Sequence, residues 1–276
     1  MPIRMISISE IRLCEPIRGL LTARLMVRDA EPGTVLVTGA ARRLGRVIAL
    51  DFARRGWRVG VHYHASTAAA SALVAQIEAM GGSATALQAD LAEIEGLSAL
   101  IAACADRLGS VTCLINNAAC FDWDSIESLD RQSWQAHLQI NLRAPVFLTQ
   151  AFAKQLPEAA DGNVINMLDQ KVLRLDPEYF SYTIAKSGLW VATQVLAQAL
   201  APRVRVNAIA PGPVLPSQTQ HKASFEREVG ATLLKHPVSA EDVAAAIGFL
   251  IDTPSVTGQM IALDSGQHLA WSTGER

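Results

Sequence analysis

Short β-branched runs alternate with longer Ala- and Leu-rich stretches from Thr34 onward, and this alternation predicts βαβ units that build a parallel sheet. Seven runs have the character of strands: 34–39, 57–63, 83–90, 111–119, 162–168, 204–211 and 259–266. Between them, apolar positions repeat at helical spacing, for example in the stretches 44–55 and 68–80. No internal repeat or linker interrupts the order, so we expect one doubly wound α/β domain over residues 34–276.

Residues 1–33 precede this pattern and form an N-terminal extension. They carry scattered arginines but no continuous apolar core and no small-residue cleavage site, which argues against a secretory signal. We expect either a disordered lead-in or an upstream segment of a protein whose natural start is Met26.

The composition narrows the class of partner. Half of the residues are hydrophobic, which is ample for a core, and 24 Lys and Arg against 26 Asp and Glu leave a net charge of −2. This balance gives no field that would attract nucleic acid or an anionic membrane, and no apolar stretch is long enough to span one. We therefore expect a small-molecule substrate.

The cysteines show neither CxxC pairs nor the spacing of a zinc site. They stand at Cys14, Cys104, Cys113 and Cys120. We interpret them as reduced thiols of a cytoplasmic protein and expect no metal.

A glycine-containing turn, TGAARRLG (38–45), ends the first expected strand and opens the first helix. Gly39 and Gly45 would let backbone N–H groups approach a pyrophosphate at the helix N-terminus. Arg43 replaces the middle glycine of the common fingerprint, and Arg42 and Arg43 could add positive charge. The alternatives are an ordinary strand-to-helix turn and two solvated surface arginines.

The end of the second strand bears on which nicotinamide cofactor binds. An acidic side chain there would hold the free ribose 2′-hydroxyl of NAD, but no Asp or Glu occurs between Asp51 and Glu78. His64 and Ser66 in that loop can instead donate hydrogen bonds to a phosphate. The sequence therefore predicts NADPH.

Tyr182 and Lys186 are four residues apart and would share one face of a helix. A phenol with a pKa near ~10 is a poor acid at neutral pH, and a neighbouring ammonium would favour its phenolate. By itself this spacing is common, and an exposed Tyr/Lys pair is the alternative.

The order of motifs makes the catalytic interpretation specific. The glycine turn is followed by NNAA (116–119), Asn141, a polar residue after the fifth strand, the Tyr/Lys pair and PG (211–212). From Thr34 to about Leu269 this order resembles the short-chain dehydrogenase/reductase family. The resemblance implies a single-domain Rossmann fold with a parallel seven-stranded sheet, and it implies cofactor contacts from Gly39, Arg42, Arg43, Leu44, Gly45, His64, Ser66, Asp90, Leu91, Asn117, Ala118, Tyr182, Lys186, Pro211 and Gly212.

The family also implies a proton relay. Asn141 holds a water, Lys186 binds the nicotinamide ribose, and Tyr182 exchanges a proton with the substrate. Most members have serine thirteen residues before the tyrosine, whereas this chain has Asp169. An ionised carboxylate would repel the charge that develops on a carbonyl oxygen, so the aspartate is either protonated or suited to a different substrate.

Four features resemble the pteridine reductases and the related bacterial dihydromonapterin and dihydrofolate reductases. They are TGAARRLG, HYHAS (62–66), Phe121 shortly after the NNA triplet, and Asp169. This branch implies that Phe121 stacks on a pterin, that Arg43 reaches cofactor and substrate, that Asp169 and Tyr182 protonate a ring nitrogen, and that the enzyme is a homotetramer. The alternative is that Asp169 points away and pairs with Lys171 or Arg174.

Two positions depart from the pteridine reductase pattern. Ala65 replaces an arginine that would bind the 2′-phosphate, and Ala119 replaces a serine that would orient the substrate. The region Pro213–His236, expected to close over the substrate, carries no specificity signature. A carbonyl or 3-ketoacyl reductase therefore stays open as an alternative. A non-catalytic nucleotide sensor is disfavoured because Asn141, Tyr182 and Lys186 are all kept.

Overall fold

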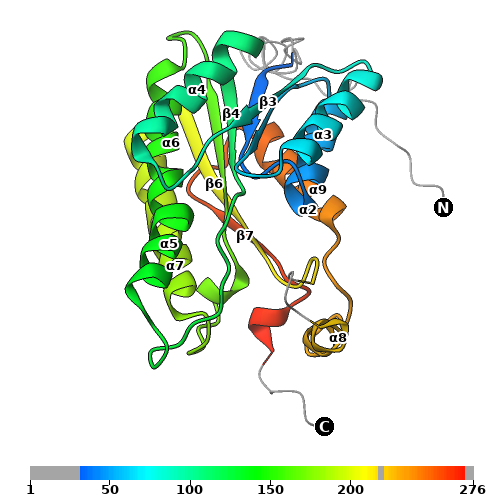
Figure 1. Cartoon of the computed structure of the whole chain (residues 1–276), viewed down its shortest axis with the longest axis vertical. Coiled ribbons are helices and arrows are strands. Elements are labelled where there is room, and N and C mark those ends of the chain that lie inside the picture. The colour runs from blue at the N-terminus through cyan, green and yellow to red at the C-terminus, as the bar shows by residue number, and fades with distance from the viewer. Residues whose placement is uncertain (1–31, 217–220, 271–276) are drawn as a thin grey trace, which may run out of the picture. The chain divides into compact units, whose positions relative to one another are not determined.

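The computed structural model describes residues 32–216 and 221–270, so most of the predicted N-terminal extension lies outside the described residues, as do Cys14 and the tail 271–276. The predicted fold class is confirmed: seven parallel strands form one sheet in the order β3-β2-β1-β4-β5-β6-β7 (Figure 1). The strands are β1 Thr34–Val37, β2 Arg58–Tyr63, β3 Ala84–Gln88, β4 Val111–Asn116, β5 Gly162–Met167, β6 Val204–Pro211 and β7 Met260–Leu263.

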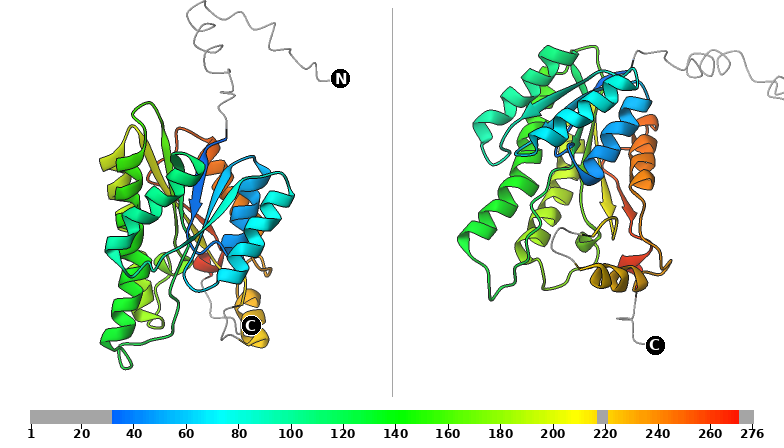
Figure 2. Two further views of the ribbon diagram at one scale, coloured as in Figure 1. Left: turned by 45° about the horizontal axis from the view of Figure 1, so that its top comes forward. Right: turned by 45° about the vertical axis from the view of Figure 1, so that its right-hand side comes forward.

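Helices cover both faces of the sheet (Figures 1 and 2). One face carries α2 Arg43–Arg54, α3 Thr67–Ala79 and α9 Ala240–Asp252. The other carries α4 Ile94–Leu108, α5 Arg131–Leu138, the π-helix η2 Gln139–Arg143, α6 Ala144–Gln155 and α7 Phe180–Leu200. Three short elements, η3 Gln170–Val172, α8 Lys222–Gly230 and η4 Gln267–Leu269, belong to the end of the sheet where the parallel strands finish. Within the described ranges, no helix combines the length and apolar character that a membrane crossing requires.

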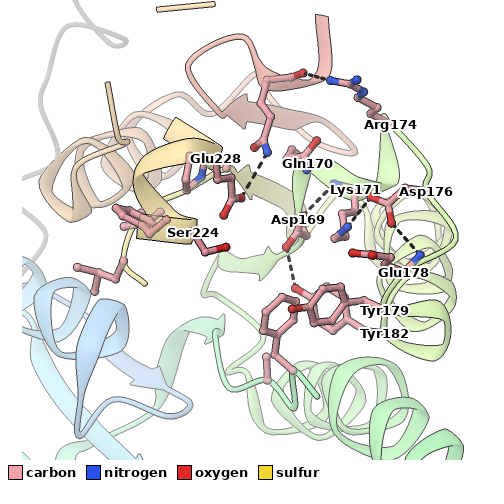
Figure 3. A pocket seen from close by; sticks show the side chains of 18 of the residues that line it. Asp169, Gln170, Lys171, Arg174, Asp176, Glu178, Tyr179, Tyr182, Ser224 and Glu228 are labelled. Atoms are coloured by element: carbon pink, nitrogen blue, oxygen red, sulfur yellow. Dashed lines mark hydrogen bonds and ion pairs between the residues drawn. The ribbon is translucent and has the colours of Figure 1, made fainter. Parts of the chain in front are cut away.

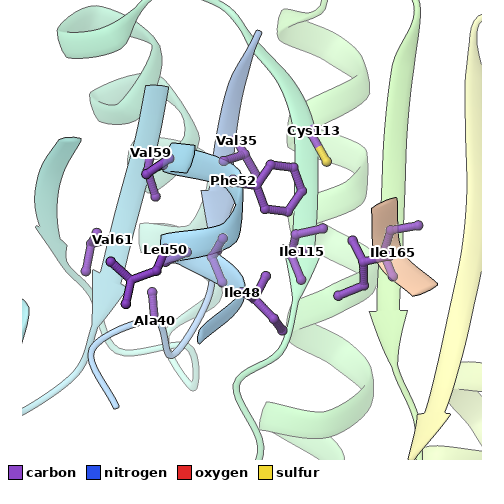
Figure 4. Packing of buried hydrophobic residues seen from close by; sticks show 14 of the residues in the cluster. Val35, Ala40, Ile48, Leu50, Phe52, Val59, Val61, Cys113, Ile115 and Ile165 are labelled. Carbon is purple, nitrogen blue, oxygen red and sulfur yellow. The ribbon is translucent and has the colours of Figure 1, made fainter. Parts of the chain in front are cut away.

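Two apolar layers hold the helices on the sheet. Phe52 and Ile48 of α2 pack against Ile115 and other strand residues on one face (Figure 4), and Phe152 belongs to the cluster on the other face. All four side chains are almost fully buried. Burial of each such side chain contributes about 1.5–3 kcal/mol, and burial on both faces explains why the strands are almost continuously apolar.

Five of the seven strands end earlier than the sequence pattern predicted, whereas β2 and β6 end where it predicted. β1 ends at Val37, β4 at Asn116 and β7 at Leu263, because the chain leaves the sheet immediately afterwards. Gly39, for example, has a left-handed φ of +63° that breaks the strand. The strand order reverses between β1 and β4, and the loops after these strands are where a doubly wound sheet forms a ligand crevice.

Candidate active site

The glycine turn has no room for a side chain at Gly45, where the backbone lies close to Gly39 and Asn117. A Cβ on Gly45 would lie 2.3 Å from the Gly39 oxygen and 2.6 Å from Nδ2 of Asn117. Helix α2 begins immediately after Arg42, whose side chain makes no cap hydrogen bond, and its first turn contains no acid. The N–H groups and the positive end of the helix dipole therefore suit a pyrophosphate.

Arg43 crosses from this turn to the segment after β6. Its φ is +51°, so it keeps the left-handed backbone conformation that a glycine would adopt most easily. Its Nη2 atom donates to the backbone oxygen of Pro216 at 2.8 Å and to that of Leu215 at 3.3 Å. Arg43 is exposed yet hydrogen-bonded to the segment after β6, and its contacts with cofactor and substrate stay a prediction.

His62 forms a hydrogen bond with the glycine turn and was not among the predicted site residues. The Gly39 amide donates to Nδ1 of His62 at 3.0 Å, and Nε2 lies 3.2 Å from the Ala89 oxygen. Burial lowers the pKa of His62 to about 4, which keeps the ring neutral and able to accept. The available signal was a histidine in a strand covered on both faces, where a polar side chain needs a partner.

A cavity of about 640 Å³, which we call the turn cavity, opens beside the glycine turn. Its walls include most of the residues predicted to bind the cofactor: Gly39, Arg42, Arg43, Leu44, Gly45, Ser66, Asn117 and Ala118, together with Phe121. Seven other predicted cofactor residues are not in its wall: His64, Asp90, Leu91, Tyr182, Lys186, Pro211 and Gly212. Nε2 of His64 lies 3.7 Å from Oδ2 of Asp90, and the Leu91 side chain is buried in the core. Any cofactor contact from Leu91 would have to come from its backbone.

A second cavity of about 640 Å³, the tyrosine cavity, contains Tyr182 and Asp169 (Figure 3). It shares Arg43, Leu44, Ala119 and Phe121 with the turn cavity, so the two spaces adjoin. The predicted cofactor residue Gly212 also lies in its wall, directly after Pro211 at the end of β6.

Gly212 allows a close approach of two loops at this wall. A Cβ there would lie 2.7 Å from Cα of Asp264, while its amide donates to the Leu263 oxygen at 2.8 Å. The same cavity is also lined by residues of the region expected to close over the substrate, including Ser224, Phe225 and Glu228.

The carboxylate of Asp169 faces Tyr182, the tyrosine predicted to be catalytic. The Tyr182 hydroxyl donates to Oδ2 of Asp169 at 2.9 Å, and the Lys171 amide donates to Oδ1 at 2.9 Å (Figure 3). Nζ of Lys171 pairs with Asp176 at 2.5 Å, and Arg174 donates to a backbone oxygen. The alternative in which Asp169 turns away to an ion pair with Lys171 or Arg174 is therefore wrong.

Burial and this contact set the protonation of the site. Burial raises the pKa of Asp169, and burial together with the Asp169 charge raises the pKa of Tyr182 well above its usual value. Nζ of Lys186 donates to the Met167 oxygen at 2.7 Å, and burial lowers its pKa to about 8. The expectation that Lys186 makes Tyr182 a phenolate is wrong for this structure. The Asp169 carboxylate accepts the Tyr182 hydroxyl hydrogen bond, and its charge favours the protonated form of the phenol.

Asn141 lies in the π-helix η2 and is fully buried. Its Nδ2 donates to the Cys120 oxygen at 2.8 Å, and its Oδ1 accepts from the Cys120 amide at 2.9 Å. Both ends of the side chain therefore hold the loop after β4. The water-holding role that the resemblance implies stays a prediction, since Nδ2 has a second hydrogen and Oδ1 a second lone pair beyond the bonds to Cys120.

Phe121 forms an aromatic wall with two tyrosines. Its ring stacks on Tyr179 with centroids 4.4 Å apart and planes 5° from parallel, and it meets Tyr182 edge-on at 4.7 Å. Tyr179 has a φ of +53° and was not predicted as a site residue. A flat ligand would find here an apolar surface next to the Tyr182 hydroxyl.

Three potential metal ligands, two from this loop and one from α5, also come together here, although no metal was expected from the sequence. Ligand atoms of Cys120, Asp122 and His137 lie within 4.8 Å of one another. They already bond to each other, because the thiol donates to the Asp122 carboxylate and the Asp122 amide donates to Nε2 of His137. We assign no metal to this group.

Comparison with known proteins agrees with this geometry. The model of a family described as enoyl-(acyl carrier protein) reductase matches residues 39–268. The chain is 34% identical to a 3-oxoacyl-[acyl-carrier-protein] reductase of Synechocystis over 84% of its own length and 95% of that protein. The chain therefore belongs to the short-chain dehydrogenase/reductase family.

Two solved structures are more similar in sequence. One is the FolM alternative dihydrofolate reductase 1 of Brucella canis complexed with NADP, with 44% identity, a TM-score of 0.86, and coverage of 88% of this chain and 96% of that one. The other is the Brucella suis protein, also in complex with NADP, with 45% identity, a TM-score of 0.85, and coverage of 87% and 96%.

Proposed function

We propose that the chain is an NADPH-dependent reductase of a pteridine C=N bond, converting a dihydropterin, dihydromonapterin or dihydrofolate to its tetrahydro form. The observation that carries this proposal is the 2.9 Å hydrogen bond from the Tyr182 hydroxyl to Oδ2 of Asp169 inside the tyrosine cavity. The Brucella structures support it, since both are described as alternative dihydrofolate reductases in complex with NADP.

The Tyr182–Asp169 pair suits the reduction of C=N better than that of C=O. Reduction of C=N adds a hydride to carbon and a proton to nitrogen, so the site needs a proton donor. Tyr182 and Asp169 both have raised pKa values and lie in contact, so together they can hold that proton and deliver it. A carbonyl oxygen that gains negative charge would instead be repelled by an ionised Asp169.

The turn cavity suits the dinucleotide. Gly39 and Gly45 would bring backbone amides to the pyrophosphate, and NADPH would supply the hydride. Arg42 and Ser66 lie in the wall where the 2′-phosphate is expected, and no acid stands between Asp51 and Glu78 to repel it. Lys186 is placed one helical turn from Tyr182, where it would hold the nicotinamide ribose.

Phe121 and Arg43 would bind the pterin. Phe121 offers an aromatic face next to Tyr182, and Arg43 lies in the walls of both cavities, where it can reach cofactor and substrate. The pterin would therefore stack between Phe121 and the nicotinamide.

A 3-oxoacyl reductase is the second candidate, and the similarity to the Synechocystis protein favours it. The test measures NADPH oxidation with a panel of 7,8-dihydropterins, 7,8-dihydrofolate and 3-oxoacyl thioesters. The pteridine proposal expects turnover of at least one pteridine. Activity confined to the thioesters would reject it.

A homotetramer and a cytoplasmic location remain predictions. Exposed apolar side chains on α6 and α7, namely Phe147, Val191 and Val195, are compatible with contacts between subunits. Light scattering coupled to size exclusion would give the mass of the assembly, and a monomer would contradict the prediction.

A further inference from the structure

Three buried polar side chains lie beside Tyr182 without a part in the proposed chemistry. They are Asp124, His137 and Ser181, which are 2%, 0% and 0% exposed. They come from the loop after β4, from α5 and from the first turn of α7. We call them the Asp–His–Ser cluster. Buried polar groups in contact are costly unless fully paired, so their pairing is informative.

Asp124 anchors the start of α7. Its Oδ1 accepts from the Ser181 amide at 3.1 Å, its Oδ2 accepts from the Ser181 hydroxyl, and its backbone oxygen accepts from the Phe180 amide at 3.2 Å. The Ser133 hydroxyl also donates to Oδ2, at 2.9 Å. Burial by itself would raise the pKa of Asp124, but these hydrogen bonds outweigh burial and hold the pKa below its usual value. The carboxylate thus satisfies the free Ser181 amide, and the backbone oxygen of Asp124 satisfies that of Phe180, in the first helical turn.

His137 connects this anchor to the loop that carries Phe121. The Asp122 amide donates to Nε2 of His137 at 3.2 Å, which assigns the lone pair to Nε2 and the proton to Nδ1. Nδ1 lies 2.7 Å from the Ser181 hydroxyl oxygen and 3.0 Å from the Ser133 backbone oxygen. The Ser181 hydroxyl therefore accepts from His137 and donates to Asp124, so each hydrogen bond in the cluster has one direction.

The cluster touches both walls of the tyrosine cavity. Ser181 directly precedes Tyr182, and the His137 ring meets the Tyr182 ring edge-on with centroids 6.1 Å apart. Asp122 directly follows Phe121. A single buried group therefore joins the helix that presents the phenol to the loop that presents the aromatic wall.

We propose that the Asp–His–Ser cluster is a positioning device that fixes the Tyr182 hydroxyl relative to Asp169 and Phe121. The inference rests on the proposed role of Tyr182 as proton donor and holds whichever substrate is reduced. Proton transfer depends steeply on geometry, and a displacement of about 1 Å can lower the rate by about a hundredfold.

The first test compares two hydroxyls that flank Tyr182. Ser181→Ala removes the hydroxyl that links His137 to Asp124. Thr183→Val removes a buried hydroxyl for which the described residues provide no hydrogen-bond partner. The rate of NADPH oxidation with the best substrate of the panel is divided by the number of NADPH-binding sites. A variant that yields less folded protein is then not mistaken for a slower enzyme.

We expect Ser181→Ala to lower kcat about tenfold or more, because the phenol is no longer held in place. The solvent deuterium isotope effect on kcat should rise, because proton transfer becomes the slow step. Thr183→Val should stay within about twofold of the wild type in both measurements.

The second test uses the two nitrogens of His137. In His137→Gln the side-chain amide can reach the former Nε2 position and keep the bond from Asp122, whereas in His137→Asn it replaces Nδ1 and keeps the bond to Ser181. We expect His137→Gln mainly to lower kcat, through Tyr182, and His137→Asn mainly to raise KM for the substrate, through the Phe121 loop.

Two results would overturn the inference: equal kcat and isotope effects in Ser181→Ala and Thr183→Val, or His137 variants that change only the number of NADPH-binding sites. The Tyr182→Phe variant distinguishes failure of the positioning inference from failure of the proposed function. An active Tyr182→Phe enzyme would reject the proton-donor role itself, whereas an inactive one beside an unaffected Ser181→Ala rejects only the positioning.

Discussion

The rings of Phe121 and Tyr179 lie face to face, 4.4 Å apart at their centroids and 5° from parallel, with Nζ of Lys171 5.2 Å from the centre of the Tyr179 ring. Tyr179 therefore holds one face of Phe121 in the wall of the tyrosine cavity. Phe121 is 39% exposed as a residue, so a flat ligand can reach it from the cavity.

Phe121→Ala is expected to raise KM for a dihydropterin about tenfold, because stacking of a heterocyclic base on an aromatic side chain contributes about 1–3 kcal/mol. Steady-state kinetics would measure this. Trp123→Ala is the matched control, since Trp123 is an exposed aromatic of the same loop. Equal effects of the two substitutions would contradict a specific role for Phe121.

The buried His62 makes the stability depend on pH. Its pKa falls from 6.5 to about 4 on burial, so the folded protein binds fewer protons than the unfolded chain between these values. The stabilisation is complete above pH 6.5, is lost as the pH falls towards 4, and amounts to about 3 kcal/mol in total. His62→Asn, whose amide can still accept from the Gly39 amide, should lose less stability between pH 7 and pH 5.

Urea unfolding at both pH values measures this difference between wild type and His62→Asn. An identical loss of stability in the two proteins would show that His62 does not titrate between folded and unfolded states as its burial implies.

Gly45→Ala tests the cofactor cradle. The new Cβ would lie 2.3 Å from the Gly39 oxygen, and overpacking against backbone costs about 1–3 kcal/mol. We expect NADPH to bind at least about tenfold more weakly, as measured by fluorescence titration. Gly96→Ala in α4 is the control, because its Cβ would meet nothing within 4 Å and should stabilise the helix by about 0.5–1 kcal/mol. Unchanged NADPH affinity in Gly45→Ala would place the pyrophosphate elsewhere.

The fold and the positions of the candidate catalytic residues were predictable because their signals are local. The alternation of strands and helices is visible in the chain, and Tyr182 and Lys186 lie one helical turn apart on α7. Asp169 could be identified from its spacing to Tyr182, and the structure places the two in contact.

The remaining site residues depend on contacts between distant parts of the chain. Ser181 is hydrogen-bonded to Asp124, 57 residues away in the sequence, and to His137, 44 residues away. Nothing in the local sequence pattern connects these three residues. The protonation of Tyr182 was also missed. The spacing shows that a lysine is near the phenol, but only the structure shows that a carboxylate accepts the hydrogen bond of the phenol.

We propose above all that Asp169 makes this site that of a pteridine reductase. The most direct test compares kcat/KM for a dihydropterin with kcat/KM for a 3-oxoacyl thioester, in the wild type and in Asp169→Ser, with NADPH affinity measured in parallel. We predict that Asp169→Ser lowers kcat/KM for the dihydropterin about a hundredfold or more, because a general acid is lost, and leaves thioester reduction and NADPH affinity unreduced. An Asp169→Ser enzyme that retains or raises its activity on the dihydropterin would contradict the account.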